Sequence, residues 1–427
     1  MTQLDALADF ISPRVGLIRS LNRRRKSDDE PALPVIYDAV LAHYDFRKGD
    51  GVERGACGKG CTDEQAMLGA IGEAIEHYCA SHPALKAIRR ASASSFNEEW
   101  IDARDFVLFS EWQYARGTLP FSRWKPEDEV PWIRARDVAS GTYVWVPAVL
   151  VYLNYRGEQP QDLLCAPTSN GLAAGPTLEA AVRTGTMELL ERDAFLITWM
   201  NRLPVPEIDF SGERGAIGEI RSSYETSGTE IRLFLLATDM PISAVMAVAL
   251  DRTGSGPAAI VGLGCDPQPR EAVRKAVFEI GQIHDLLTRR FAEGKADRLN
   301  AYADVESLED HAAYFFRRDH FHELDFLLSH GRKVPLGDIA GHDDAEVFES
   351  IRARGYRVFD VDVTTPDVRP YPIRAARVLI TELQPIHFGQ GVERLGGRRL
   401  YELPQRLGYT EAETTEETLN PCPHPLA

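Results

Sequence analysis

The stretch Gly69-Ala-Ile-Gly-Glu73-Ala-Ile-Glu76 places two glutamates three residues apart in a run of small and apolar residues. Residues three apart on a helix share a face, so the two carboxylates are expected side by side. The apolar spacing predicts a helix over Asp63–Ala80 with Thr62 as its N-cap. Such a pair is either the polar face of an amphipathic helix or a pair of ligands for a cation.

Two later segments repeat this pattern. They are Glu188-Leu-Leu-Glu191-Arg192, in a helix predicted from its N-cap Thr177 to about Met200, and Glu279-Ile-Gly-Gln282, in a helix predicted from Pro269 to about Arg290. Buried carboxylates are costly unless they are paired or bind metal, and Mg²⁺ takes carboxylates together with substrate phosphates. The sequence contains neither GxxxxGK[ST] nor GxGxxG, so we expect a nucleotide-using enzyme without a glycine-rich phosphate loop.

Composition narrows the class of protein. The chain has 427 residues, 44% of them hydrophobic, which suffices for one large domain or two joined lobes. A net charge of −16 argues against nucleic-acid or anionic-membrane binding. Six cysteines in so long a chain are no disulfide scaffold, and no signal peptide or membrane span is evident, so we expect a cytoplasmic protein. The longest apolar stretch, residues 143–153, is interpreted as a buried strand pair.

The order of elements predicts an α+β fold with mixed or antiparallel sheets rather than a doubly wound one, because helices and strands do not alternate strictly. Three regions are expected: an arm and entry segment (1–56), a catalytic domain (57–408), and an acidic linker with a proline-punctuated tail (409–427). The predicted strands are Ile231–Ala237, Ser243–Leu250, Ala258–Gly264, Arg357–Val363 and Ala376–Leu383.

The end of the chain reads Pro421-Cys-Pro423-His-Pro425. Such a segment is either an unstructured linker or a stiff tail that fixes the terminal carboxylate inside a site, because proline loses less entropy on ordering. His387, in Gln384-Pro-Ile-His-Phe-Gly389, is interpreted as a core histidine.

Together these residues resemble the YcaO family from about Ser12 to the end of the chain. The resemblance is carried by four blocks: Gly58-Lys-Gly60 through Glu76, Ser169-Asn-Gly-Leu-Ala-Ala-Gly175, Met187-Glu-Leu-Leu-Glu-Arg-Asp193 and Glu279-Ile-Gly-Gln282.

The resemblance implies an ATP and Mg²⁺ site. Four glutamates would face Mg²⁺: Glu73, Glu76, Glu188 and Glu191. The residues around the nucleotide would be Lys59, Asn170, Arg192, Glu279 and Gln282. Two positions depart from the family pattern, since Gly69 replaces a usual serine and His77 a frequent arginine.

Three features resemble the azoline-forming cyclodehydratases of stand-alone D-protein type: Ile11-Ser-Pro-Arg-Val-Gly16, Gln384-Pro-Ile-His-Phe-Gly389 and the proline tail. The resemblance implies that the tail arranges the catalytic centre, through Pro421, Pro423, Pro425 and the terminal Ala427. The implied reaction is ATP-dependent: a Cys, Ser or Thr side chain of a ribosomally made precursor peptide closes onto the preceding carbonyl, whose oxygen is phosphorylated.

The resemblance also implies partners. We expect a precursor peptide, a separate E1-like (ThiF-like) leader-binding protein, a homodimer and, as a further option, a flavin dehydrogenase, without nucleic acid or membrane. Two alternatives stay open, namely thioamide or amidine formation on a peptide, and an inactive YcaO-like scaffold within a maturation complex.

Overall fold

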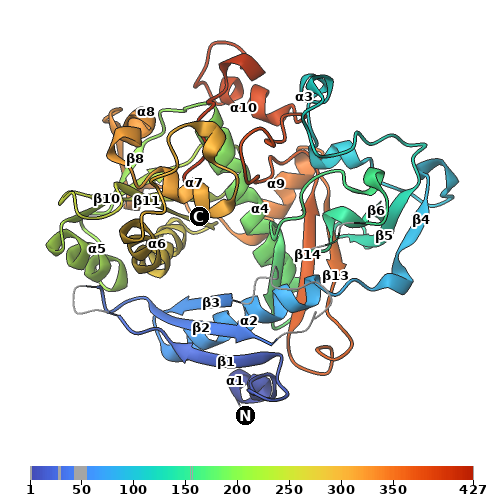
Figure 1. Cartoon of the computed structure of the whole chain (residues 1–427), viewed down its shortest axis with the longest axis horizontal. Helices are drawn as coiled ribbons and strands as arrows, with labels where there is room; N and C mark the ends of the chain where they lie inside the picture. The colour runs from blue at the N-terminus through green and yellow to red at the C-terminus, as the bar shows by residue number, and fades with distance from the viewer. Residues whose placement is uncertain (1, 27–29, 43–54, 154, 156, 427) are drawn as a thin grey trace.

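The computed structural model describes residues 2–26, 30–42, 55–153, 155 and 157–426. Its strands form three sheets within these residues (Figure 1). The first is antiparallel and has the order β1-β2-β3, from Ile18–Arg23, Val35–Leu41 and Gly55–Gly60. Helix α2 (Asp63–Ala80) packs on this sheet, while the short α1 (Gln3–Leu7) lies near the N-terminus.

The second sheet has five strands in the order β11-β10-β9-β8-β12. All neighbours are antiparallel except β8 and β12. Helix α6 (Pro269–Ala292) packs on β11 and β10, and α5 (Ala216–Thr226) packs on β9. The strands span Ala259–Asp266 (β11), Ser243–Asp251 (β10), Thr229–Leu235 (β9), Glu207–Asp209 (β8) and Lys333–Pro335 (β12).

The third sheet is antiparallel and has the order β4-β5-β13-β14-β7, with β6 paired to β5. Helix α4 (Leu178–Met200) contacts β7 and β14 of this sheet and also β10 and β11 of the second. The strands span Arg89–Ala91 (β4), Val130–Asp137 (β5), Tyr143–Pro147 (β6), Leu172–Gly175 (β7), Val358–Asp362 (β13) and Arg374–Ile380 (β14).

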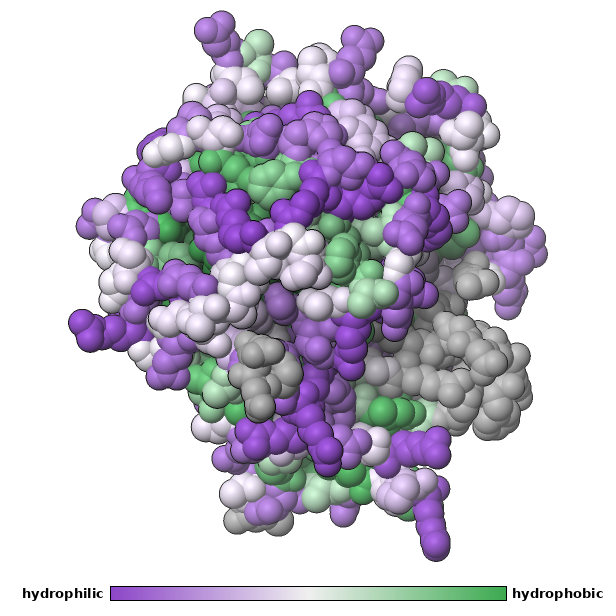
Figure 2. Space-filling view, turned by 60° about the vertical axis from the view of Figure 1, so that its left-hand side comes forward, coloured by the Kyte–Doolittle hydropathy of each residue, from purple (hydrophilic) through white to green (hydrophobic). Residues whose placement is uncertain are grey.

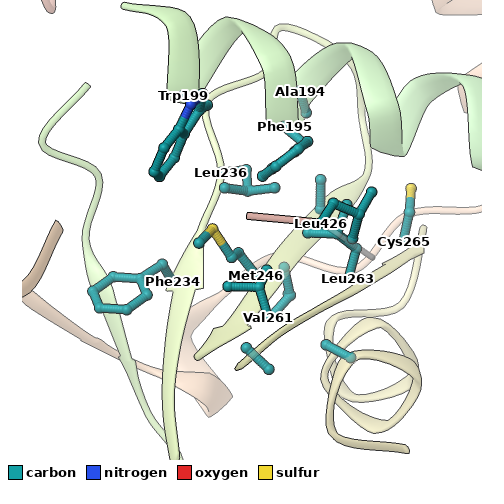
Figure 3. Close-up of a cluster of buried hydrophobic side chains, with 14 of the residues drawn as sticks. Ala194, Phe195, Trp199, Phe234, Leu236, Met246, Val261, Leu263, Cys265 and Leu426 are labelled. Carbon is teal, nitrogen blue, oxygen red and sulfur yellow. The ribbon is translucent and has the colours of Figure 1, made fainter. Parts of the chain in front are cut away.

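Helix α4 is buried on nearly all sides because it lies between two sheets. Its residues from Ala194 to Met200 are all buried, and Phe195 and Trp199 point into the core of the second sheet (Figure 3). The remaining helices are short: α3 (Glu111–Arg116), α7 (Leu308–Tyr314), α8 (Asp325–Leu328), α9 (Asp344–Ala353) and α10 (Arg399–Arg406).

The α+β prediction is confirmed, and so are the bounds of the first two long helices with their N-caps Thr62 and Thr177. The third helix ends at Ala292 rather than near Arg290. The interpretation of residues 143–153 as a strand pair is wrong. Strand β6 ends at Pro147, and Ala148–Leu150 turns as a 3₁₀ helix, because proline cannot extend the strand ladder.

The surface in Figure 2 is largely hydrophilic, with only small hydrophobic areas between charged and polar residues. In the part of the chain that the structure describes, no helix has the length and apolar character needed to cross a membrane.

A buried ion cluster attaches α4 to the C-terminal region. The guanidinium of Arg399, 1% exposed, lies 2.8 Å from Asp193 on α4 and 2.6 Å from Asp239. Asp193 also accepts the backbone N–H of Gln384 at 2.9 Å. A buried charge that loses its partner is strongly destabilising, so this cluster holds the segment after β14 in place.

We expect Arg399→Met to lower the free energy of unfolding by about 3–5 kcal/mol, because Asp193 would stay buried without its cation. The neighbouring Arg398→Met is the matched control. The side chain of Arg398 is 83% exposed and pairs with Glu402 at the surface, so its loss should change stability by less than about 0.5 kcal/mol. Urea unfolding of both variants checks this, and equal effects would contradict it.

Candidate functional site

The same hydrogen bond occurs in three strand–helix units. The backbone N–H of Cys57 donates to the carboxylate of Glu73 at 3.0 Å, and that of Leu263 donates to Glu279 at 3.3 Å. The N–H of Gly171, just before β7, donates to Glu188 at 3.1 Å. Each bond links a strand, or its first flanking residue, to the helix that follows. The hydrogen bond thereby holds one glutamate of each unit against the strand of the same unit, or against the residue just before that strand.

The strands of these units, β3, β7 and β11, each lie at the end of the strand order of a different sheet. Each of them carries a glycine where the backbone of the following helix approaches closely. A Cβ at Gly58 would overlap the carbonyl oxygen of Ala66, a Cβ at Gly264 would overlap that of Ala272, and a Cβ at Gly175 would lie 2.8 Å from the backbone nitrogen of Ala181. Contacts of α2 with β7, of α4 with β11 and of α6 with β3 bring the three sheet edges, and their glutamates, to one place.

Packing explains why glycine stands at position 69, where the resemblance leads us to expect a serine. A Cβ there would lie 3.2 Å from the Cα of Gly58 on β3, tighter than most real contacts. A serine would require α2 and β3 to separate by a few tenths of an ångström, so glycine suits the close approach at which Glu73 lies over Cys57.

Charge repulsion and burial act together on the carboxylates. Burial raises the pKa of Glu76 well above its ordinary value, and the charges of Glu188 and Glu73 raise it further. Burial likewise raises the pKa of Glu188. The pKa of Glu191 is raised to about 7, mainly by burial and then by Glu279 and Glu188, against the lowering effect of Arg192. These carboxylates are close enough to oppose one another's ionisation, which favours binding of a cation.

Two cations from the predicted set lie among these carboxylates. The Nζ of Lys59 lies 3.8 Å from Glu279. The buried Nη1 of Arg192 lies 3.5 Å from Glu191 and its Nη2 lies 3.9 Å from Glu188, and Nη1 makes no hydrogen bond among the described residues beside this ion pair. A buried guanidinium N–H without an acceptor is costly, so Arg192 has capacity for an anionic oxygen.

Sequence reasoning missed Arg377, which lies beneath the site on β14. Its guanidinium donates to the backbone oxygens of Val151 at 2.9 Å and Thr168 at 2.6 Å, and also to that of Asn170. Burial lowers its pKa to about 10 against the raising effect of Glu188 and Glu76. The signal was an arginine within the apolar strand Ala375-Ala-Arg-Val378.

The other predicted nucleotide residues occupy the margins of the cluster. The side chain of Gln282 hydrogen-bonds the Cys57 thiol. The backbone carbonyl of Gln282 accepts from the guanidinium of Arg24 at 2.6 Å. Asn170 is buried directly before Gly171. Arg24 also pairs with Asp38, so one residue of the basic run Arg23-Arg-Arg-Lys26 is a structural contact rather than a solvated loop residue.

The proline tail lies along α4. The N–H of Asn420 donates to Met200 at 2.7 Å, Trp199 donates from its indole to the Cys422 carbonyl at 3.0 Å, and the His424 ring meets Phe195. Leu426 then forms a parallel bridge with Val261 on β11, close to Leu263 (Figure 3).

The tail therefore runs antiparallel to α4, from Met200 at its end past Trp199 and Phe195 in the direction of Arg192. Pro423 and Pro425 are buried and Pro421 is exposed, while Ala427 lies outside the described residues. His387 is buried, as expected, and its backbone oxygen accepts from the His424 ring at 2.8 Å.

The residues fit an ATP and Mg²⁺ site by their donor chemistry. Glutamate pairs from α2 and α4, with Glu279 and Gln282 from α6, offer oxygen ligands, and the Nη1 of Arg192, which makes no hydrogen bond among the described residues, suits a phosphate oxygen. Among the described residues, no three Asp, Glu, His or Cys side chains are arranged to hold an ion by themselves.

The family comparison identifies the chain. The model for YcaO cyclodehydratases, described as ATP- and Mg²⁺-binding, matches residues 57–384. The chain belongs to the YcaO family. An uncharacterised protein of Methanothermobacter thermautotrophicus is 31% identical over 318 residues, which cover 68% of this chain and 77% of that protein.

Three solved structures share the fold. A heterocyclase in complex with substrate and cofactor gives a TM-score of 0.80 at 24% identity, covering 100% of this chain and 58% of that one. The YcaO of Methanopyrus kandleri bound with AMPPCP and Mg²⁺ gives 0.62 at 22% identity, covering 86% of each chain. The E. coli microcin synthetase McbBCD complex gives 0.58 at 17% identity, covering 84% of this chain and 86% of that one. The chain thus spans little more than half of the first heterocyclase.

The raised pKa of Glu191 predicts a pH dependence of stability. Its pKa is about 7 in the folded state and about 4.3 in an unfolded chain, so the folded state holds the proton more tightly. The contribution of Glu191 to the free energy of unfolding is therefore complete below the pKa of the unfolded chain and is lost as the pH rises through the folded-state pKa of about 7. We expect Glu191→Gln to raise the metal-free melting temperature most at pH 8 and least at pH 5.

Thermal unfolding across this range checks the expectation. Glu64→Gln is the matched control, because Glu64 is exposed on the first turn of α2 and should leave the pH profile unchanged. A Glu191→Gln profile that parallels the wild type would contradict the assignment.

Proposed function

We propose that this protein is an ATP-dependent cyclodehydratase that converts Cys, Ser or Thr residues of a ribosomally made precursor peptide to thiazolines or oxazolines. The observation that carries the proposal is the glutamate cluster from α2, α4 and α6 around the guanidinium of Arg192, whose buried Nη1 makes no hydrogen bond among the described residues. Similarity to a heterocyclase fold over the whole chain supports it.

When bound, ATP would supply a phosphoryl group that turns the amide oxygen into a leaving group, with Mg²⁺ neutralising phosphate charge. Glu73, Glu76, Glu188 and Glu191 would hold the metal. The remaining contacts with the nucleotide would come from Lys59, Asn170, Arg192, Glu279 and Gln282. Because Glu191 has a pKa near 7, cation binding there displaces a proton at neutral pH.

Arg192 would stabilise negative charge on the transferring group, since its burial strengthens each of its hydrogen bonds. The tail would position the peptide's reacting residue through Pro421, Pro423, Pro425 and Ala427. Its bonds to Met200 and Trp199 and its bridge to β11 support such a positioning role.

We further propose a separate leader-binding protein of E1-like type as partner, a homodimeric state, and cytoplasmic action. The microcin synthetase, solved as a complex of different proteins, supports the partner. Residues 57–408 would form the catalytic domain, flanked by the arm and entry segment (1–56) and by the linker and tail (409–427).

The direct test is mass spectrometry of a candidate precursor peptide with ATP, Mg²⁺ and the partner. We expect loss of one water for each modified residue, abolished in Glu191→Gln. Exchange of oxygen for sulfur would instead establish thioamide formation. If the nucleotide does not bind and the peptide mass is unchanged, the protein is a scaffold.

A second test concerns the tail. We expect Pro423→Ala to slow the reaction about tenfold, roughly 1.4 kcal/mol, because a buried, stiff segment becomes more flexible. The affinity for Mg²⁺–AMPPCP should not change. The exposed Pro421→Ala is the matched control and should have a smaller effect, whereas equal rates in both variants and the wild type would count against a positioning role.

A further inference from the structure

His311, on helix α7, is a buried histidine to which the proposed reaction assigns no role. The residue is 0% exposed, and both of its ring nitrogens make hydrogen bonds. The Nδ1 lies 2.9 Å from the backbone oxygen of His424 in the proline tail, and the Nε2 lies 2.9 Å from the backbone nitrogen of Gly389. One side chain thus joins the tail to the end of the loop 384–389.

The two partners of His311 fix its protonation state. A backbone carbonyl can only accept and a backbone N–H can only donate, so Nδ1 carries a proton and Nε2 does not. The ring is therefore neutral, in its Nδ1–H tautomer. Burial lowers the pKa of His311 to about 4, against the raising effects of the bond to His424 and of Asp310, so the ring stays neutral at pH 7.

A stack of two histidine rings adds to these bonds. The ring of His311 lies against that of His424, with 3.9 Å between the centroids and an interplanar angle of 18°. The Nε2 of His424 in turn donates to the backbone oxygen of His387, in the same loop as Gly389, at 2.8 Å. The tail is therefore bonded to the loop twice, directly through His424 and indirectly through His311.

The tail leads from His311 to the candidate site. Two residues after His424, Leu426 forms a parallel bridge with Val261 on β11, the strand that bonds the glutamate of α6 (Figure 3). Burial lowers the pKa of His424, and the positive charge of Arg192 lowers it further, so the tail lies within electrostatic reach of that guanidinium. The place of His424 therefore bears on how the end of the chain lies beside the site.

The helix that carries His311 is itself held firmly. Asp310, the preceding residue, pairs with Arg298 and accepts the backbone N–H groups of Glu306 at 3.2 Å and Ser307 at 3.1 Å. Helix α7 also packs against α6. These contacts make α7 a fixed support from which His311 reaches the tail.

We propose that His311 is a positioning residue for the reaction. As a neutral Nδ1–H tautomer it holds the proline tail at a set distance from the loop 384–389, and it thereby orients the end of the chain beside the glutamate cluster. The inference rests on the proposed function, in which the tail positions the reacting residue of the peptide. His311 acts through His424, so its loss should slow turnover and leave nucleotide binding unchanged.

The test uses His311→Phe, which keeps an aromatic ring against His424 but removes both hydrogen bonds. With the precursor peptide that the wild type modifies, we expect kcat for water loss to fall about 10- to 100-fold, because the end of the chain is misplaced. The KM for ATP should stay within about twofold of the wild type, since the nucleotide contacts are intact. By hydrogen-exchange mass spectrometry, residues 419–426 should exchange faster, while α2 should not change.

His311→Asn is the conservative variant and His320→Phe the matched control. Asparagine keeps an N–H donor near the position of Nδ1, so kcat should be about fivefold higher than in His311→Phe. His320 is a buried histidine that stacks on Tyr314 of α7 at 3.8 Å and bonds the Tyr314 carbonyl through Nδ1 at 2.8 Å. Its replacement disturbs α7 but leaves both bonds of His311 in place, so turnover and tail exchange should match the wild type.

Several results would overturn the proposal. They are unchanged kcat and tail exchange in His311→Phe, an equal loss in His320→Phe, or a fall in Mg²⁺–AMPPCP affinity that accounts for the slower turnover. If the wild type shows no ATP-dependent water loss, the cyclodehydratase proposal fails, and tail exchange in His311→Phe decides by itself whether His311 holds the tail. If His311→Phe does not fold, the test passes to His311→Gln, which keeps an acceptor near the position of Nε2 but no donor at that of Nδ1.

Discussion

The hydrogen bond from a strand N–H to a glutamate on the following helix is the constraint on which the site depends. It occurs at Cys57–Glu73, Gly171–Glu188 and Leu263–Glu279. An ionised carboxylate that accepts a backbone N–H is held in one orientation and partly compensated for its burial. Because each bond joins consecutive elements, local chain geometry sets the position of each glutamate, and helix packing needs only to bring the three units together.

The site is electrostatically unfavourable without a ligand, and the surrounding structure carries that cost. Burial, and then repulsion among carboxylates, raises the pKa of Glu76, Glu188 and Glu191, while the buried Nη1 of Arg192 makes no hydrogen bond among the described residues. The buried ion cluster around Arg399 is, in contrast, fully paired. The molecule thus uses one set of buried charges to attach α4 and leaves another set available for a ligand, which is typical of functional sites.

The helices that carry the glutamates could be predicted because they depend on local sequence patterns. The spacing of glutamates among apolar residues indicated the helices, and Thr62 and Thr177 fixed where two of them begin. The convergence of three sheet edges could not be predicted, since it depends on contacts between elements far apart in the chain, such as those of α2 with β7 and of α6 with β3. Arg377 was missed because a single arginine in a strand gives no periodic signal.

The origin of the glutamates from three separate sheets has a consequence for the dynamics of the chain. A ligand held by α2, α4 and α6 at once would connect three sheets at their edges, so local opening of any one of them would require release of that ligand. Amide hydrogens in β3, β7 and β11 should then exchange with solvent at separate rates in the ligand-free protein and at a common, slower rate in the complex. In that sense the ligand would stabilise the tertiary structure as a whole, because it would couple the opening of the three sheets.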